Sequence, residues 1–535
     1  MSFDSILMFV GVIIAILAII PRAKLLLIKI KVSWFDIALM VICCVIILYL
    51  LFINSFLVFG VSPGWNLHKW KITPSNSIFL ILLSLSFYLL IRYNCFSFSI
   101  RKINKVGRLI DNMIQEGKYN DLIDFLDKNF KRLNDITNRK TWYLKFRDRA
   151  KIKRYPRLEK FFNEETISLK DRFINFLILP LRILPSFDKC SSESENIISR
   201  IVLNEDFIEF IVKSHSYIFL KFFDINRYYQ SDFVNLIFRK LLSNNRSILY
   251  TELENTQNLN HYSNYWIIDE NKLIYFLFND PTKAEKLAIW QPIGEYFIEK
   301  MGYLHRHPEL DNFNTNIQNY YESSRWKSDV FIAIHFFDVM VSQALYKNIQ
   351  WHMRLYYYNY FVEEILKNHK NTDMFYDPND EWPTKYEYLI YQIFSNMENW
   401  IKSLDEIDIN QENVKIENTH LTHNNGNIPV SAIITIGLSL KSLFESTTIS
   451  SKFKYYIFSM IFELYFYLRN QESLLDYSIL LAKAIFYKIE MTYQDLEDYY
   501  SFLDESFEKH FDKAPIQFER LTEFRNILAN RGNNL

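Results

Sequence analysis

Histidine and carboxylate side chains gather in one short segment after a predicted helix. His305, His307, Glu309 and Asp311 lie close together in the chain. Imidazole nitrogens and carboxylate oxygens bind divalent ions and help to activate water in hydrolases and nucleases. Their spacing matches no established ligand motif, and histidines after a helix C-terminus are also favoured by the helix dipole. The segment is a candidate catalytic site, with a solvated loop as the alternative.

Three other positions carry groups that suit chemistry. Glu252 lies between apolar helical patterns, where burial would raise its pKa and suit it to acid–base work, although a paired or surface carboxylate is the alternative. His420 and His423 are three residues apart and would share a helix face as metal ligands. The polar residues 424–427 that follow them argue against a helix there. We expect no resident metal and no cofactor.

A basic stretch with interleaved aromatic residues spans residues 139–160. Basic residues close to a bilayer attract anionic lipid headgroups, by about 1 kcal/mol each. The same composition suits a nucleic-acid backbone, or a solvated helix whose aromatic residues face a core. We expect anionic headgroups as the ligand and nucleic acid as the less favoured one. The expected contacts are Arg139, Lys140, Lys145, Arg147, Arg149, Lys151, Lys153, Arg154 and Arg157.

Several enzyme classes lose support from what the sequence lacks. The chain has only 10 glycines in 535 residues, and no nucleotide-binding loop or nucleophile-elbow motif is present. Its 4 cysteines show no C-x-x-C spacing, which disfavours a disulfide scaffold or a cysteine zinc site.

The elements that would position these groups begin with apolar segments near the N-terminus. Three predicted membrane spans cover about residues 5–21, 37–59 and 77–93. Lys and Arg are concentrated in the loop after the first span and directly after the third, so the positive-inside rule predicts an N-terminus outside and a cytoplasmic C-terminal part. The expected location is the inner (cell) membrane, with multiple spans in the lipid bilayer and no charge at mid-membrane.

Helical apolar spacing dominates after residue 100. Residues 106–133 predict two helices joined at residues 116–118, 206–223 predict one helix capped by Asp206, 231–242 predict another, and Pro292 should divide the helix at 283–303. Further helices are predicted at 325–346, 350–369, 384–403, 430–446, 451–469, 472–490, 493–510 and 515–531.

The predicted fold is mostly α: three N-terminal transmembrane helices followed by a large all-α cytoplasmic domain, an irregular, solenoid-like helical array. We divide the chain into a transmembrane region (1–95), a basic juxtamembrane segment (96–160), a helical domain (161–425) and a C-terminal helical subdomain (426–535).

The expected function is that of a membrane-anchored cytoplasmic scaffold or sensor that binds a protein partner. Such a protein would suit a bacterial stress or phage-defence system. One alternative is a membrane-anchored hydrolase or nuclease that uses the His305 segment. Another is a membrane-permeabilising effector whose spans oligomerise.

Overall fold

The computed structural model describes residues 30–32, 34–52, 74–95, 98, 100–138, 187–214, 217–225, 227–258, 264–317, 324–349, 354–370, 382–416 and 427–486. Within these residues the chain is almost entirely helical, with one short antiparallel strand pair, so the all-α prediction is confirmed. Two compact units are present. Unit 1 comprises Met1–Phe207 and Asp224–Tyr229, and unit 2 comprises Ile208–Phe223 and Gln230–Leu535.

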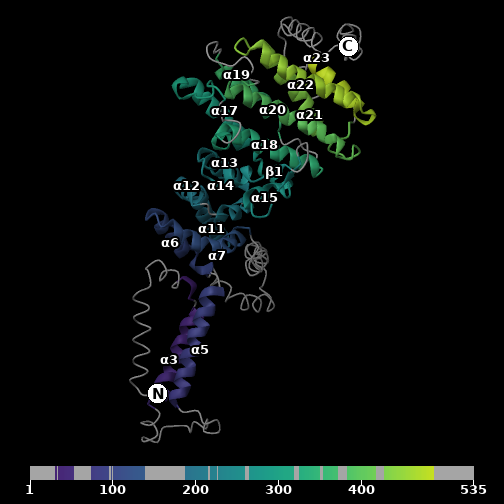
Figure 1. Cartoon of the computed structure of the whole chain (residues 1–535). Helices are drawn as coiled ribbons and strands as arrows, with labels where there is room; N and C mark the ends of the chain where they lie inside the picture. The colour runs from purple at the N-terminus through teal and green to yellow at the C-terminus, as the bar shows by residue number, and fades with distance from the viewer. Residues whose placement is uncertain are drawn as a thin grey trace, which may run out of the picture. The chain divides into compact units, whose positions relative to one another are not determined.

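Unit 1 contains a pair of apolar helices and a group of amphipathic ones (Figure 1). Its elements are α3 (Trp34–Leu51), α5 (Pro74–Cys95), η2 (Ile100–Lys102), α6 (Ile103–Gln115), α7 (Tyr119–Thr137) and α11 (Phe187–Val202). The predicted second span overlaps α3 and the predicted third span lies within α5. The first predicted span lies outside the described residues.

Helices α3 and α5 pack along each other, bury few of their apolar side chains and leave many of them exposed. Helix α3 has a mean hydropathy of 2.6, yet only 11% of it is buried. The backbone polar groups of α3 and α5 are hydrogen-bonded within each helix. The unusual feature is the apolar side-chain surface that remains exposed. The exposed large side chains are Trp34, Phe35, Ile37, Val41, Ile42, Val45 and Leu48 on α3, and Phe79, Leu80, Leu83, Phe87 and Ile91 on α5.

A buried carboxylate joins the two apolar helices at one end. Asp36 is 1% exposed and accepts hydrogen bonds from the Tyr88 hydroxyl at 2.5 Å and from Arg92 Nε at 3.2 Å. The Lys102 ammonium, on η2, donates to the backbone carbonyl of Val32 just before α3. These bonds connect α3 both to α5 and to the segment that leads into α6.

The predicted two-helix unit at residues 106–133 is confirmed as α6 and α7. Gly117 has a φ of 66°, in the left-handed region that ends helices and favours glycine. The amide of Lys118 donates to the Met113 carbonyl at 2.8 Å and thereby closes the turn. Helix α11 packs against both helices, and the side chains of Leu122, Leu126 and their apolar neighbours form the core.

The predicted helix at 206–223 is wrong in two respects. It is divided into α12 (Glu205–Lys213) and η4 (Tyr217–Asp224), and its N-cap is Asn204, whose side chain accepts from the Phe207 amide at 2.8 Å. The Ser214 hydroxyl donates to the Ile211 carbonyl, a local bond that competes with helix continuation.

Unit 2 holds the remaining elements and most of α12 and α13. They are α13 (Arg227–Ser243), α14 (Ile248–Glu254), β1 (Gln257–Asn258), β2 (Tyr265–Trp266), α15 (Lys272–Phe278), α16 (Thr282–Leu287), α17 (Trp290–Arg306), η5 (Pro308–Leu310), η6 (Ser324–Lys327), α18 (Asp329–Tyr346), α19 (Tyr357–Asn368), α20 (Lys385–Lys402), η7 (Ser403–Asp405), α21 (Ile428–Glu445), α22 (Ser451–Arg469), η8 (Glu472–Leu474) and α23 (Leu475–Phe486).

The helix predicted at 283–303, which Pro292 was expected to kink or divide, is divided, but the break precedes the proline and is not made by it. Helix α16 ends at Leu287, and Ala288 follows with a φ of 50°. Pro292 then lies in the first turn of α17, where its missing amide hydrogen leaves no intrahelical bond unmade.

The C-terminal helices of unit 2 alternate between two packed sets. Helices α17, α19, α21 and α23 each pack against the next in that set, and α18, α20 and α22 do the same. Helix α21 also packs against α20, and both helices belong to unit 2. The expected C-terminal subdomain after residue 425 remains a prediction. Predicted helices at 493–510 and 515–531 lie outside the described residues.

Close helix approach in this part depends on glycine. A Cβ atom at Gly437 of α21 would lie 2.4 Å from the Ala484 carbonyl oxygen of α23, and one at Gly294 of α17 would lie 2.4 Å from the Tyr357 ring. A side chain at either position would force the helices apart.

Helices α18 and α21 are also long and apolar, but unlike α3 they are 83% and 78% buried within unit 2. Among the described residues, these two and α3 are the helices long and apolar enough to cross a membrane by composition. Buried polar groups of α18, such as Asp338 and Gln343, are hydrogen-bonded to neighbouring elements. Helices α18 and α21 therefore form the core of unit 2.

Candidate functional site

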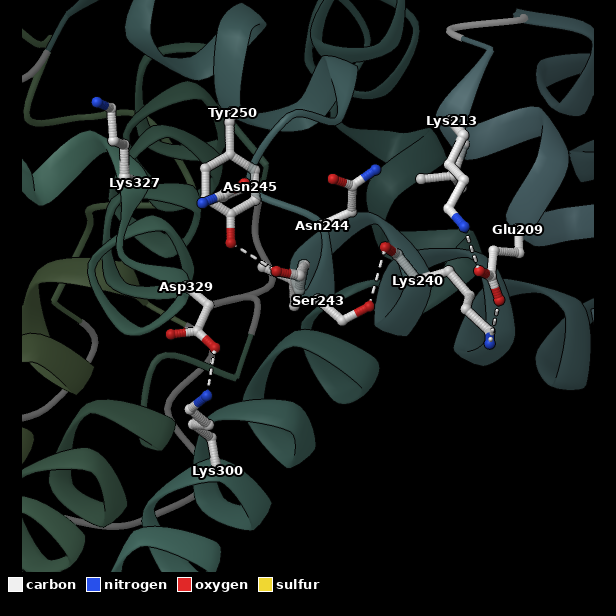
Figure 2. Close-up of a pocket in the computed structure, with 12 residues that line it drawn as sticks. Glu209, Lys213, Lys240, Ser243, Asn244, Asn245, Tyr250, Lys300, Lys327 and Asp329 are labelled. Carbon is white, nitrogen blue, oxygen red and sulfur yellow. Dashed lines mark hydrogen bonds and ion pairs between the residues drawn. The ribbon is translucent and has the colours of Figure 1, made fainter. Parts of the chain in front are cut away.

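A hollow of about 550 Å³ opens in unit 2 and is lined mainly by charged and polar side chains (Figure 2). Its volume lies within the range of about 300–1,000 Å³ that is typical of small-molecule sites. The charged residues in the lining are Glu209, Lys213, Lys240, Lys300, Lys327 and Asp329.

One side of the hollow is formed by α12 and α13. Glu209 and Lys213 are one helical turn apart, and their side chains meet at 2.6 Å; Lys240 of α13 reaches the second carboxylate oxygen of Glu209 at 3.3 Å. The hydrogen bonds from Lys213 and then Lys240 lower the pKa of Glu209 below its ordinary value. Glu209 is therefore a carboxylate at neutral pH and is shared by two ammonium groups.

The other side is formed by α17 and the start of α18. Lys300 Nζ lies 3.0 Å from the Asp329 carboxylate, which also accepts the Tyr296 hydroxyl at 2.9 Å. Ser328 caps α18 by accepting the Phe331 amide, and the other oxygen of Asp329 accepts the Val330 amide at 3.0 Å. Asp329 thus occupies the positive end of α18 and is held by groups from two helices.

The residues between these two ion-pair groups come from the end of α13 (Ser243), the loop that follows it (Asn244 and Asn245) and α14 (Tyr250) (Figure 2). The hydroxyls of Tyr250 and Ser243 donate to backbone carbonyls, at 2.5 Å and 3.2 Å. The Asn244 side-chain oxygen accepts the Arg246 amide at 3.1 Å, so the side chain can offer its amide hydrogens to a ligand. Asn245 also lines the hollow and is exposed. The two asparagines are therefore the neutral donors best placed to meet a ligand.

The charges of the lining do not cancel. Among the described lining residues, four lysines face two carboxylates, a surplus of two positive charges. A concave site with surplus positive charge attracts anions. Neither a nucleophile–base pair nor a metal-binding group accompanies the lysines in the described lining, and no group of three or more His, Cys, Asp or Glu side chains in the described chain could hold a metal. The arrangement suits binding.

Glu252 is buried, as a functional carboxylate would be, but its partners are structural. One of its oxygens accepts the backbone amides of Leu273 and Ile274, both at 2.9 Å, and the other accepts the Tyr217 hydroxyl at 3.0 Å. Burial raises the pKa of Glu252, whereas these bonds oppose that shift. Burial and the nearby carboxylate also raise the pKa of Tyr217 to about 12. Glu252 therefore caps the N-terminus of α15.

The histidine and carboxylate segment lies largely exposed at the end of α17 and in η5. His305 and His307 are exposed, and His307 Nδ1 lies 3.3 Å from Glu309 in a solvent-facing pair. Asp311 accepts the Phe313 amide at 2.8 Å and closes a turn. The structure shows no geometry here that would activate water, and a catalytic role for these residues remains a prediction.

The other predicted ligands lie outside the described residues. These are the basic residues of 139–160, expected at lipid headgroups, and His420 and His423, the candidate metal ligands.

Sequence reasoning did not identify the buried carboxylate at the centre of unit 2. Asp338 of α18 accepts the Tyr265 hydroxyl at 2.5 Å and the Trp400 indole N–H at 2.9 Å, and the Ser342 hydroxyl lies 3.4 Å away. Burial raises the pKa of Asp338 to about 6 and lowers that of His335, 3.9 Å away, to about 4. This network joins β2, α18 and α20 and is enclosed, so it stabilises the core.

A second buried pair lies where α19 ends. His369 Nε2 is 3.9 Å from Glu387, and each side chain is 4% exposed. Glu387 and Thr384 form a capping box at the start of α20, with mutual bonds of 2.9 Å and 3.3 Å. Burial raises the pKa of Glu387 to about 7 and lowers that of His369 to about 4. The capping-box pattern was readable in the sequence, since Thr384 precedes Glu387 by three residues.

Comparison with known proteins gives no relative. The chain matches no protein-family model, no curated protein and no solved structure.

Proposed function

We propose that this protein is a membrane-anchored helical scaffold or sensor, held in the inner membrane by its N-terminal helices. In this proposal α3 and α5 cross the bilayer, the chain after them is cytoplasmic, and unit 2 binds a protein partner. Three spans would place the N-terminus outside, as the loop charges predict.

The observation that carries the proposal is the contrast between α3 and the apolar helices of unit 2. Helices α18 and α21 bury their apolar surface inside the protein, whereas α3 leaves its apolar surface exposed and has the higher hydropathy. Exposed large apolar side chains also line α5. Water disfavours a surface of this extent, and a lipid bilayer removes that cost.

The packing of α17–α23 supports the scaffold part of the proposal. Helix pairs stacked in two sets are the construction principle of α-solenoids, which present extended surfaces to proteins or peptides. The spacing of the helices along the chain is irregular, so the array would be an irregular solenoid. The basic residues of 139–160 would hold the cytoplasmic part against anionic headgroups.

Membrane attachment is tested by alkaline carbonate extraction of the full-length protein from its host membranes. We expect the protein to stay in the membrane pellet. A triple variant with Val41, Val45 and Leu48 of α3 changed to Asn should be extracted in part, because each asparagine amide is costly in hydrocarbon while the other spans still hold the protein. The matched control changes three exposed apolar residues of unit 2, Leu310, Tyr360 and Ile479, to Asn and should stay in the pellet. Extraction of the unaltered protein by carbonate contradicts the proposal.

The interaction role is tested by affinity capture of the detergent-solubilised protein from its host. A stoichiometric protein partner that is lost when residues 290–486 are deleted supports the scaffold. Retention of the same partner by residues 1–207 alone contradicts it.

A further inference from the structure

The charge arrangement of the hollow favours one kind of anion. Lys213 and Lys240 both contact the carboxylate of Glu209, so the lining on this side holds more ammonium than carboxylate groups. Lys327 is exposed and adds a further positive charge to the described lining.

This surplus matches the charge of a phosphate ester, which is about −1.5 to −2 at pH 7. The described lining contains lysines and no arginine. An arginine fork favours planar carboxylates, whereas lysine ammonium groups bind phosphate as point charges. The amide hydrogens of Asn244 and Asn245 supply neutral donors for further phosphate oxygens.

The size of the hollow sets the scale of the ligand. A volume of about 550 Å³ exceeds what a single inorganic anion needs and suits an organic phosphate of nucleotide size. Val212, Leu242 and Tyr250, which are almost fully buried, form the apolar part of the lining. The buried hydroxyl of Tyr250 donates to a carbonyl, so its ring offers packing and the lysines offer charge.

We infer that the hollow of unit 2 binds a phosphate ester, either a free nucleotide-sized molecule or the phosphorylated headgroup of a lipid, through Lys213, Lys240 and Lys327. The inference goes beyond the proposed tether and scaffold, because every residue that carries it belongs to unit 2. The ligand of the proposed sensor would then be a phosphate ester.

The test is calorimetric titration of the full-length protein in a neutral detergent. Pyrophosphate probes the shared chemistry, ADP probes a free nucleotide, and inositol 1,4-bisphosphate probes a lipid headgroup. We expect saturable binding that weakens as salt is raised, since partly exposed charges are screened. Tighter binding of ADP assigns a free ligand, and tighter binding of the inositol phosphate assigns a headgroup. No saturable binding of any of the three probes overturns the inference.

Three variants locate the binding. Lys240→Gln with Lys327→Gln removes the surplus charge and should weaken binding at least about ten-fold, as expected for charged hydrogen bonds. Glu209→Gln removes the shared carboxylate, frees two ammonium groups and should strengthen binding about three-fold or more. The control is Lys367→Gln on α19, which breaks an exposed pair with Glu364 at 2.6 Å and should leave binding unchanged.

The opposite signs of these effects separate ligand binding from loss of folding, because a misfolded variant cannot bind more tightly. Melting curves of all variants provide a second check. Affinity equal to that of the unaltered protein in the Lys240→Gln, Lys327→Gln variant places the ligand elsewhere and overturns the inference.

Discussion

Replacing Glu252 by Ala should destabilise unit 2 far more than replacing it by Gln. The carboxylate oxygen that accepts the Leu273 and Ile274 amides is the capping group of α15, and Glu252 is 3% exposed. Alanine leaves both amides without an acceptor in a buried place. Glutamine can present its single carbonyl oxygen to the same two amides while its amino group donates to the Tyr217 oxygen.

The expected cost follows from these partners. An unsatisfied buried donor costs about 1–3 kcal/mol, so losing the acceptor for two amides should cost Glu252→Ala about 3 kcal/mol or more. The hydroxyl of Tyr217 is half-buried and can turn to water, so it adds little. For Glu252→Gln only the favourable charge at a helix N-terminus is lost, about 0.3–1 kcal/mol.

The assay is thermal unfolding of the purified full-length protein, followed by circular dichroism. For a domain of this size we expect the midpoint to fall by about 5–10 °C in Glu252→Ala and by about 1–3 °C in Glu252→Gln. Equal losses in the two variants would refute the capping role, because they would show that the charge, and not the acceptor geometry, matters. Unchanged midpoints in both would refute burial of the group.

Three further predictions use the same unfolding assay. Burial raises the pKa of Asp338 from 3.8 to about 6. The stabilisation from its protonated form, about 3 kcal/mol, is therefore complete below pH 4 and is lost as pH rises through 6. Asp338→Asn should remove this part of the pH dependence of the unfolding free energy. Gly437→Ala should cost about 1–3 kcal/mol through the clash with α23, whereas Gly302→Ala, with nothing within 4 Å, should be neutral or stabilising. Arg92→Leu should cost several kcal/mol by leaving Asp36 buried without its cation, and adding Asp36→Leu should restore part of the loss.

Several helices could be predicted because they carry local signals, whereas the short helices α14 and α15 were not predicted. Apolar periodicity predicted α22 over the residues it occupies, and the glycine at 117 predicted the α6–α7 turn. The helix at 206–223 could not be predicted correctly, because polar groups at both of its ends offer alternative local bonds: Asn204, two residues before Asp206, accepts the Phe207 amide, and the Ser214 hydroxyl donates to the Ile211 carbonyl. Such competition between nearby polar groups leaves no periodic pattern in the sequence.

The hollow could not be predicted, because its charged residues come from parts of the chain that meet only after folding. Lys213, Lys240 and Lys300 lie on three helices and follow no common spacing. Glu252 was identified from its apolar flanks, which correctly indicate burial. Its role as a cap depends on the amides at the start of α15, about 20 residues later in the chain. The sequence around Glu252 does not indicate that these amides lie close to it.

The Asp36 cluster fixes the longitudinal register of α3 and α5. A slip of one helical turn, about 5.4 Å, would separate the carboxylate from Tyr88 and Arg92, since those side chains reach it at 2.5 Å and 3.2 Å. In a thicker or thinner bilayer, free helices adapt by sliding or tilting independently. If α3 and α5 cross the bilayer as proposed, the two helices would tilt together as one body, and the bond from Lys102 to the Val32 carbonyl would carry that tilt into η2. A change in membrane thickness would then change the angle of the segment that leads into α6.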